Sequence, residues 1–485
     1  MQIKDRTLLQ RVAKGSAWIV ASQGVSLVLV FVAQRIILSS LTREQNGTLF
    51  FERRMTDLIV SLLVDFGMNA IIIRRTVQQP DMARTILSSA FAFRCFMWIV
   101  ATGASVAYAF YSGYSGVDVI IWSFYILIAA RTTLLRYVLE APYRTTSRFH
   151  FVSLLGIADA VLFTVLIWFW RESLDPSHVI TAFAISAIPG FFALFAIDRG
   201  QNIHPSFVRW SEIKALVVEA FPVLGAAMLI LMHNTSDTFF LERFGSPKDV
   251  GILGAVYTTL GPFLIVVPQA ISLAMMPEFA RFLPGENERR GLLMVTVIRL
   301  VVLLSTLVAA IGAPLLPWFI HLLSGDKYAA NSLQFFWFLW TGPMVSLLIF
   351  TLEVTLTANR RRLNLALAAS LFVFSVVFGV IYIPELLSLG AVYSRLATVV
   401  VGGAVSLVIL RQIIGEQLNL ALVLRCAAVF SSGLLLSGIL PGWMPSVFAS
   451  VAAGVGCVAV SFLVGLVRLR DVELVRGFLR RSSTA

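Results

Sequence analysis

The segment FFERRMTDLIVSLLVDFGMNAIIIRR, residues 50–75, decides how the fold is interpreted. Most of it is apolar over a length that can cross the hydrocarbon core of a bilayer, for which a helix needs about 20 residues. Its first third nevertheless holds Glu52, Arg53, Arg54 and Asp57. Each such charge costs about 3 kcal/mol at the centre of a membrane helix. A membrane helix that keeps these groups is therefore expected to use them.

The rest of the chain has the composition of a membrane protein. Of its 485 residues, 58% are hydrophobic and 13% are charged, whereas soluble domains carry about 25% charged residues. Fourteen apolar runs lack the strict alternation of barrel strands, so an all-α integral membrane fold with about 14 transmembrane helices is predicted. The runs cover residues 16–38, 48–73, 85–111, 118–139, 149–170, 178–197, 215–240, 250–276, 290–313, 333–357, 363–383, 387–410, 419–440 and 445–467.

The basic residues between these runs are distributed unequally. Alternate connections hold 24 Lys and Arg residues, and the opposite set holds 5. Positive residues favour the cytoplasmic side, which places both termini there. The net charge of +12 is explained by this bias, so no nucleic-acid partner is predicted.

Several chemistries have no sequence signal. The three cysteines, Cys95, Cys426 and Cys457, lie in apolar stretches without a CxxC pattern or a histidine partner, so neither a disulfide nor a metal site is expected. The chain has no GxxxxGK[ST] loop and no HExxH motif. We therefore expect no cofactor and no enzyme activity.

A shift of 204 residues aligns two parts of the chain and predicts a parallel repeat, the plan of many secondary transporters. We expect two six-helix lobes, residues 1–214 and 215–415, followed by two further helices and a basic tail at 416–485. The shift pairs Gln34 with Thr238, Gly47 with Gly251 and Pro80 with Pro284.

Residues 13–50, AKGSAWIVASQGVSLVLVFVAQRIILSSLTREQNGTLF, resemble the opening of the bacterial polysaccharide-export flippases of the O-antigen type. That family lies in the superfamily that includes lipid II flippases and multidrug and toxin extrusion transporters. The chain departs from the family pattern at residues 52–57, where the family usually has an uncharged helix. The matching positions are Lys14, Gly15, Ser16, Trp18, Gly47, the run DFGMNAIIIRR at 65–75, Pro222, Asp237, Gly251, Tyr257 and Pro277.

The resemblance implies a flippase of the bacterial inner membrane. Such a protein moves a polyprenyl-pyrophosphate-linked oligosaccharide from the inner to the outer leaflet by alternating access, among membrane lipids and with the polymerase and chain-length proteins of a polysaccharide pathway as expected partners. One alternative is a drug or cation antiporter of the same superfamily, which would need exposed carboxylates. Another is a membrane enzyme acting on lipid-linked sugars, although the longest outer loop has only about 20 residues, 314–332.

Arginines inside the predicted spans are the candidate substrate ligands, because a guanidinium binds phosphate oxygens through a planar fork and stays charged when desolvated. Arg35, Arg136 and Glu353 lie near span ends and are expected to snorkel. The substrate-binding set is Arg53, Arg54, Arg94, Arg131, Arg299 and Arg395.

Buried acids and one histidine are the candidates for coupling or for locking the lobes: Asp57, Asp159, His233 and Asp237. Asp57 can pair with Arg53 or Arg54 on its own helix. Asp159 offers a carboxylate to Arg94 or Arg131. His233 and Asp237, four residues apart, could relay a proton or simply hold a hydrogen bond between helices.

Overall fold

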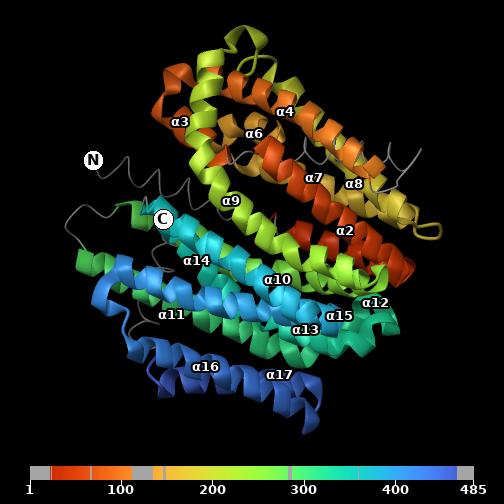
Figure 1. Cartoon of the computed structure of the whole chain (residues 1–485), viewed down its shortest axis with the longest axis vertical. Coiled ribbons are helices and arrows are strands. Elements are labelled where there is room, and N and C mark those ends of the chain that lie inside the picture. The colour runs from red at the N-terminus through yellow and green to blue at the C-terminus, as the bar shows by residue number, and fades with distance from the viewer. Residues whose placement is uncertain are drawn as a thin grey trace. The chain divides into compact units, whose positions relative to one another are not determined.

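The computed structural model describes residues 22, 24–65, 68–111, 135–145, 149–281, 287–358 and 360–466. Within these ranges the regular structure is helical and contains no strand. The chain folds as two compact units, Met1–Thr235 and Ser236–Ala485, and the boundary lies inside one long helix, α9. Figure 1 shows the helices of each unit.

The first unit begins with the helix Gly24–Ser40. It continues with α2 (Arg43–Val60), a π-helical turn (Ser61–Asp65), α3 (Asn69–Gln78), α4 (Ala83–Tyr111), α6 (Arg136–Thr145), α7 (Phe149–Phe169), α8 (Pro176–Asp198) and the greater part of α9 (Trp210–Phe244).

The second unit starts within α9 and consists of α10 (Pro247–Arg281), α11 (Asn287–Gly312), α12 (Leu316–Ser324), α13 (Ser332–Leu339), α14 (Gly342–Thr357), α15 (Arg361–Ile414), α16 (Leu420–Ile439) and α17 (Ser446–Leu463). Short 3-10 turns join several of these helices.

Many of these helices have the length and composition of membrane spans. Seven of the helical stretches in the described ranges are long and apolar enough to cross a bilayer, or eight if the two parts of α9 count as one span. In α9 the parts Trp210–Phe221 and Val223–Phe244 meet at 53°, at Pro222, which lacks the N–H that continues a helix. The protein is a multi-pass membrane protein.

Helix starts recur at the 204-residue spacing. The helix Gly24–Ser40 and α9 end 204 residues apart, and so do the starts of α2 and α10 and of α4 and α11. The caps recur as well. Thr42 and Gln45 form a reciprocal capping box at α2, and Ser246 and Asp249 bond in the same way at α10. Such boxes satisfy the orphan N–H groups of a first turn.

Two predicted spans differ from the observed helices. The span 48–73 is interrupted between Asp65 and Asn69. The span 333–357 is divided into α13 and α14. The spans 363–383 and 387–410 are the two arms of α15, which turns at Leu387. Composition identified the apolar runs and separated the two arms of α15, but it did not identify the breaks within the spans 48–73 and 333–357. The predicted span 118–139 lies mostly outside the described residues.

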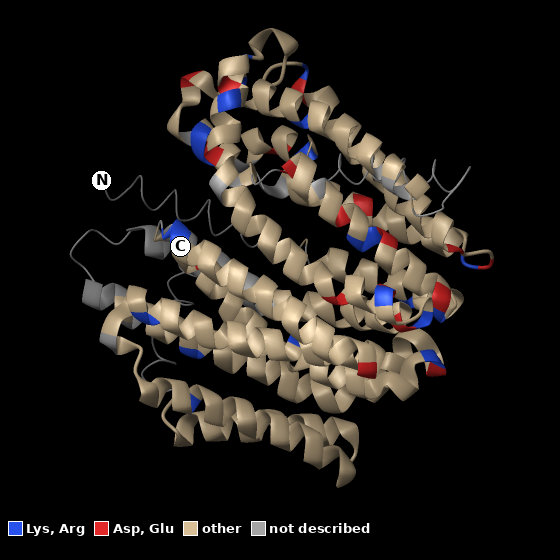
Figure 2. Ribbon diagram, in the orientation of Figure 1, with Lys and Arg blue, Asp and Glu red and all other residues tan. Residues whose placement is uncertain are grey.

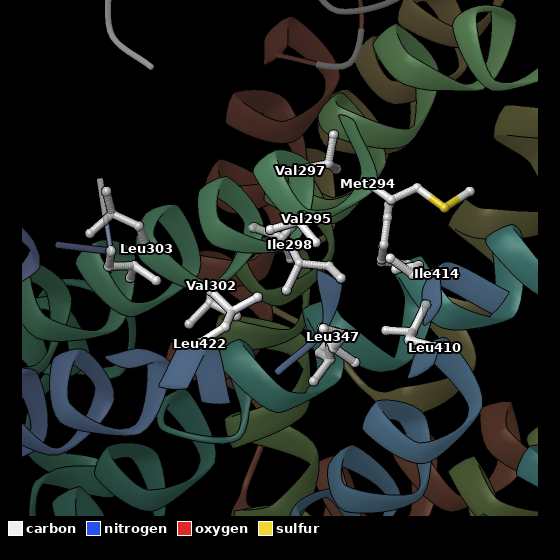
Figure 3. Close-up of a cluster of buried hydrophobic side chains, with 14 of the residues drawn as sticks. Met294, Val295, Val297, Ile298, Val302, Leu303, Leu347, Leu410, Ile414 and Leu422 are labelled. Carbon is white, nitrogen blue, oxygen red and sulfur yellow. The ribbon is translucent and has the colours of Figure 1, made fainter. Parts of the chain in front are cut away.

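The core of the second unit is apolar. Met294, Ile298 and Val302 of α11 gather with Leu347 of α14 and Leu410 of α15 (Figure 3). α16 and α17 pack on α11 and extend this core. Figure 2 shows these last two helices as almost uncharged.

Candidate functional site

The interruption of the second predicted span is built around a buried arginine. Arg94 of α4 is fully buried. Its Nη2 donates to Oδ1 of Asp65, 3.0 Å away at the end of the π-helical turn, and to Oδ1 of Asn69, 2.8 Å away at the start of α3. The Arg94 guanidinium thus forms hydrogen bonds to one residue on each side of the break. Interrupted helices free backbone groups, and membrane proteins tolerate them where protein or a wet cavity lies alongside.

A second buried arginine lies between α6, α7 and α8. Nε of Arg136 donates to Glu140, 2.8 Å away, and Nη1 of Arg136 pairs with Asp159. Gly190 of α8 lies against this group, since a Cβ there would be 2.8 Å from both Arg136 Nη1 and Asp159 Oδ1. Because Arg136 is 5% exposed, the expectation that it snorkels is wrong. It is a buried partner for two carboxylates.

The charged turn of α2 has a different environment. Arg53 and Asp57 are exposed, Arg54 is half-buried and Glu52 is 6% exposed. The Arg53 guanidinium lies 5.5 Å from the centre of the Phe183 ring on α8, and that of Arg54 lies 5.1 Å from the Phe50 ring. An aromatic face attracts a cation without neutralising its charge, and both guanidinium groups also interact electrostatically with Asp57 on the same turn of α2.

Further ion pairs join α3 to the first part of α9. Arg75 Nη1 lies 2.7 Å from Glu212 Oε1, and Arg74 pairs with Glu219. The basic end of α3 therefore has acidic partners as well as its predicted role at the cytoplasmic face.

The second unit holds a polar contact between α9 and α10. The Tyr257 hydroxyl donates to Asp237, which is 4% exposed. The Arg395 guanidinium of α15 lies 5.9 Å from the centre of the Tyr257 ring, and the Phe338 ring packs against Tyr257 at a tilt of 60°, with the ring centroids 4.5 Å apart. Side chains from the helices α9, α10, α13 and α15 therefore meet at Tyr257.

The other predicted residues lie elsewhere. Arg299 is half-buried on α11 and interacts electrostatically with Cys426 of α16. His233 is buried in α9. Arg131 lies outside the described residues. Asp159 was offered as a partner for Arg94, but the structure pairs Asp159 with Arg136 and Arg94 with Asp65.

Sequence reasoning missed two positions that shape the site. Asn69 follows Asp65 in the run DFGMNA, and an amide in an otherwise apolar segment was the available signal. Gly190 follows Pro189 within α8, but only the fold shows what lies against it. Among the described residues, no three His, Cys, Asp or Glu side chains gather as a metal site would require.

Solved structures share this fold. The chain superposes on the lipid II flippase MurJ in an inward closed conformation with a TM-score of 0.70, at 10% identity, over 94% of this chain and 99% of that one. A multidrug resistance MATE family transporter of the MOP superfamily, inward-facing, gives 0.63 at 13% identity over 82% and 98%. A MOP superfamily transporter from Pyrococcus furiosus gives 0.59 at 14% identity over 85% and 98%.

Two other comparisons give no match: no family model fits the chain, and no curated protein matches it. At these identities the likeness shows the fold alone, which this chain shares with these solved structures.

Proposed function

We propose that the protein is a transporter that flips a polyprenyl-pyrophosphate-linked oligosaccharide from the inner to the outer leaflet by alternating access. The observation that carries the proposal is which charged side chains inside the predicted spans are paired within the protein and which are exposed. Asp65, Asp159 and Glu140 all accept hydrogen bonds from buried arginines. By contrast, Arg53 on α2 is an exposed cation.

These three carboxylates therefore serve the fold, whereas the Arg53 side chain, which has Asp57 as an electrostatic neighbour, is exposed to a ligand. A cation exporter needs the reverse arrangement. A pyrophosphate carries at least two negative charges, and guanidinium groups bind it through charge-assisted hydrogen bonds. Arg53 and Arg54 are adjacent on α2, lie over the Phe183 and Phe50 rings, and share Asp57 as an electrostatic neighbour.

Within this proposal the described arginines of the predicted set have different roles. Arg53 and Arg54 contact the headgroup, and Arg94 supports the broken helix that carries them. Arg395 and Arg299 face different neighbours, Tyr257 and Cys426, so they do not act as one cluster.

The experiment is complementation with matched variants. A strain that lacks the gene is scored for the leaflet in which its lipid-linked oligosaccharide accumulates. Wild type and Arg171→Gln, an exposed arginine between α7 and α8, should both restore transfer to the outer leaflet. Arg53→Gln with Arg54→Gln should reduce the transfer rate by roughly tenfold or more, since each charge-assisted bond contributes about 1.5–3 kcal/mol.

Two outcomes would overturn the proposal. If the lipid-linked unit crosses normally in the deletion strain, the protein acts after the flip. If the double variant transports at the wild-type rate from equal protein levels, the arginines of α2 do not bind the substrate.

One observation favours export of a cationic drug instead. Asp57 is an exposed carboxylate on the same turn of α2. Drug sensitivity of the deletion strain, restored by wild type and not by Asp57→Asn, would support an antiporter and remove the flippase proposal.

A further inference from the structure

The first part of α9, Trp210–Phe221, is fixed to the first unit by one of its faces. Leu216 and Ala220 are buried and pack into the apolar cluster formed with α3 and α4. The carboxylates of Glu212 and Glu219 pair with the two arginines near the end of α3. Because an α-helix advances about 100° per residue, these four side chains lie within about 100° of arc and define the face that packs on the unit.

The opposite face of this part of α9 carries an exposed stripe. Four side chains, spaced by four, four and three residues, lie within about 80° of arc on this one helix. They are Trp210, Lys214, Val218 and Phe221. Trp210, Val218 and Phe221 are 77%, 64% and 67% exposed, and Lys214 is exposed as well. Since all four belong to one helix, their common face follows from helix geometry alone.

Two exposed cations lie at the start of the stripe. Arg209 directly precedes α9, and its backbone is fixed to α4 because the Ser89 hydroxyl accepts from the Arg209 N–H at 3.0 Å. Lys214 lies about 7.5 Å further along the helix axis, and its side chain tilts back toward the helix start. Neither cation forms an ion pair with a carboxylate in the part of the chain that the structure describes. The stripe is therefore cationic at one end and apolar at the other.

We propose that this stripe of α9 binds an anionic phospholipid of the bilayer. The headgroup phosphate lies between Arg209 and Lys214, which bind it through charge-assisted hydrogen bonds. The Trp210 indole lies at the headgroup level, where amphipathic rings are favoured, and an acyl chain lies along Val218 and Phe221. Charge complementarity selects the occupant, because two exposed cations beside an apolar strip match a lipid that carries its negative charge at the same depth.

This lipid site does not depend on the proposed transport. The connection before α9 belongs to the basic set of connections that the sequence predicts to be cytoplasmic, so the lipid comes from the inner leaflet. The ligand is a membrane lipid that is not carried across, and no residue of the charged turn of α2 contributes to its site. A failure of the flippase proposal would therefore leave the lipid site intact, and the reverse also holds.

The test measures which lipid lies against the stripe. Phe221→Trp adds an indole at its apolar end, and the unsubstituted full chain is the fluorescence blank. Both proteins are reconstituted in mixtures of phosphatidylcholine and phosphatidylglycerol, in which one lipid or the other has brominated acyl chains that quench a neighbouring indole. The added indole should report a relative binding constant of roughly 25 in favour of phosphatidylglycerol, since each basic residue near an anionic surface contributes on the order of a fivefold factor.

Two pairs of substitutions, each made with and without Phe221→Trp, make the outcome specific. Arg209→Gln with Lys214→Gln removes the proposed phosphate contacts and should lower the relative binding constant to about one. Arg243→Gln with Lys248→Gln removes the same amount of exposed charge at the α9–α10 turn and should leave the constant unchanged. A high salt concentration should also lower the preference of the Phe221→Trp protein, because exposed cations are screened by salt.

Three results would overturn the proposal. The two brominated lipids could quench the added indole equally well, or the preference for phosphatidylglycerol could persist after the charges of Arg209 and Lys214 are removed. Alternatively, neither brominated lipid could quench the indole, which would show that protein, such as a second copy of the chain, covers the stripe in place of lipid.

Discussion

One position of the shared helical frame carries a buried charge in the first unit and an apolar residue in the second. α2 and α4 of the first unit start 204 residues before α10 and α11 of the second. At that spacing, Arg94 corresponds to Ile298, which is 1% exposed in the apolar core around α11 (Figure 3).

The helices beside these two residues differ accordingly. The chain is interrupted after Asp65, where Arg94 binds both sides of the break, whereas α10 runs unbroken through the corresponding Gln269. The buried charge therefore accompanies an interrupted helix, and the apolar residue accompanies an intact one. In the first unit, the buried Arg94–Asp65 pair thus lies at a break in regular helical structure. Membrane proteins often place such breaks and such buried charges near functional sites.

Removing Arg94 should have the largest effect. Arg94→Leu leaves Asp65 without its buried partner, and breaking such a pair costs about 3–5 kcal/mol. The expected result is a strong fall in the apparent melting temperature in detergent. Ile298→Val, the matched change in the second unit, should cost about 1 kcal/mol.

The double variant Arg94→Leu with Asp65→Leu tests whether the lost pairing with Asp65 accounts for this destabilisation. Replacing both members of a buried pair by apolar residues is often close to neutral, so the double variant should recover most of the loss. If it is as unstable as the single variant, the pairing with Asp65 is not the reason for burying Arg94.

Gly190→Ala should have the next largest effect, about 1–2 kcal/mol, because its methyl group must displace the Arg136–Asp159 pair. Gly156→Ala on α7 is the control, since no atom lies within 4 Å of the added Cβ. Melting temperatures of the two variants at equal expression provide the measurement. Equal values would mean that the ion pair shifts at no cost.

The helix connections of the two units give a smaller contrast. In the order of the spans, the α7–α8 connection of the first unit corresponds to the turn of α15 in the second. Leu387 there has a positive φ, which suits glycine and disfavours residues with a Cβ. Leu387→Gly is therefore expected to stabilise the protein by about 1 kcal/mol, and a lower melting temperature for the variant would contradict this account.

The α7–α8 connection ends instead with a side-chain cap at Asp175, whose Oδ1 accepts from the His178 N–H at 2.8 Å and from the Ser177 hydroxyl at 2.7 Å. Partial burial raises the pKa of Asp175, but these hydrogen bonds and the nearby His178 outweigh it and hold the pKa below its ordinary value.

Asp175→Ala should have the smallest effect, about 0.5 kcal/mol. Because the folded pKa is lowered, the stabilisation is fully present above the ordinary value of about 3.9 and is lost as the pH falls through the folded value. The difference in stability between wild type and variant, followed from pH 7 to pH 3, should shrink toward zero. A constant difference would show that the carboxylate charge is not involved.

Composition and periodicity were sufficient to predict an all-helical membrane protein, because an apolar run of about 20 residues has few other stable conformations. The spacing of Gly47 and Gly251 also indicated a repeat whose helix starts the structure reproduces. The partners of the buried charges could not be predicted. Asp65 and Arg94 are 29 residues apart, and their pairing depends on a break that hydropathy does not register. Asp159 meets Arg136 through the packing of α7 on α6, which no local pattern encodes.

The two capping boxes, Thr42 with Gln45 and Ser246 with Asp249, also have a consequence for biogenesis. Each box lies two residues after one helix ends and directly before the next helix begins. The turn is therefore complete as soon as its few residues leave the ribosome, and its N–H groups need no other partner. Each of the two turns can therefore form from local contacts alone while the chain is still being synthesised.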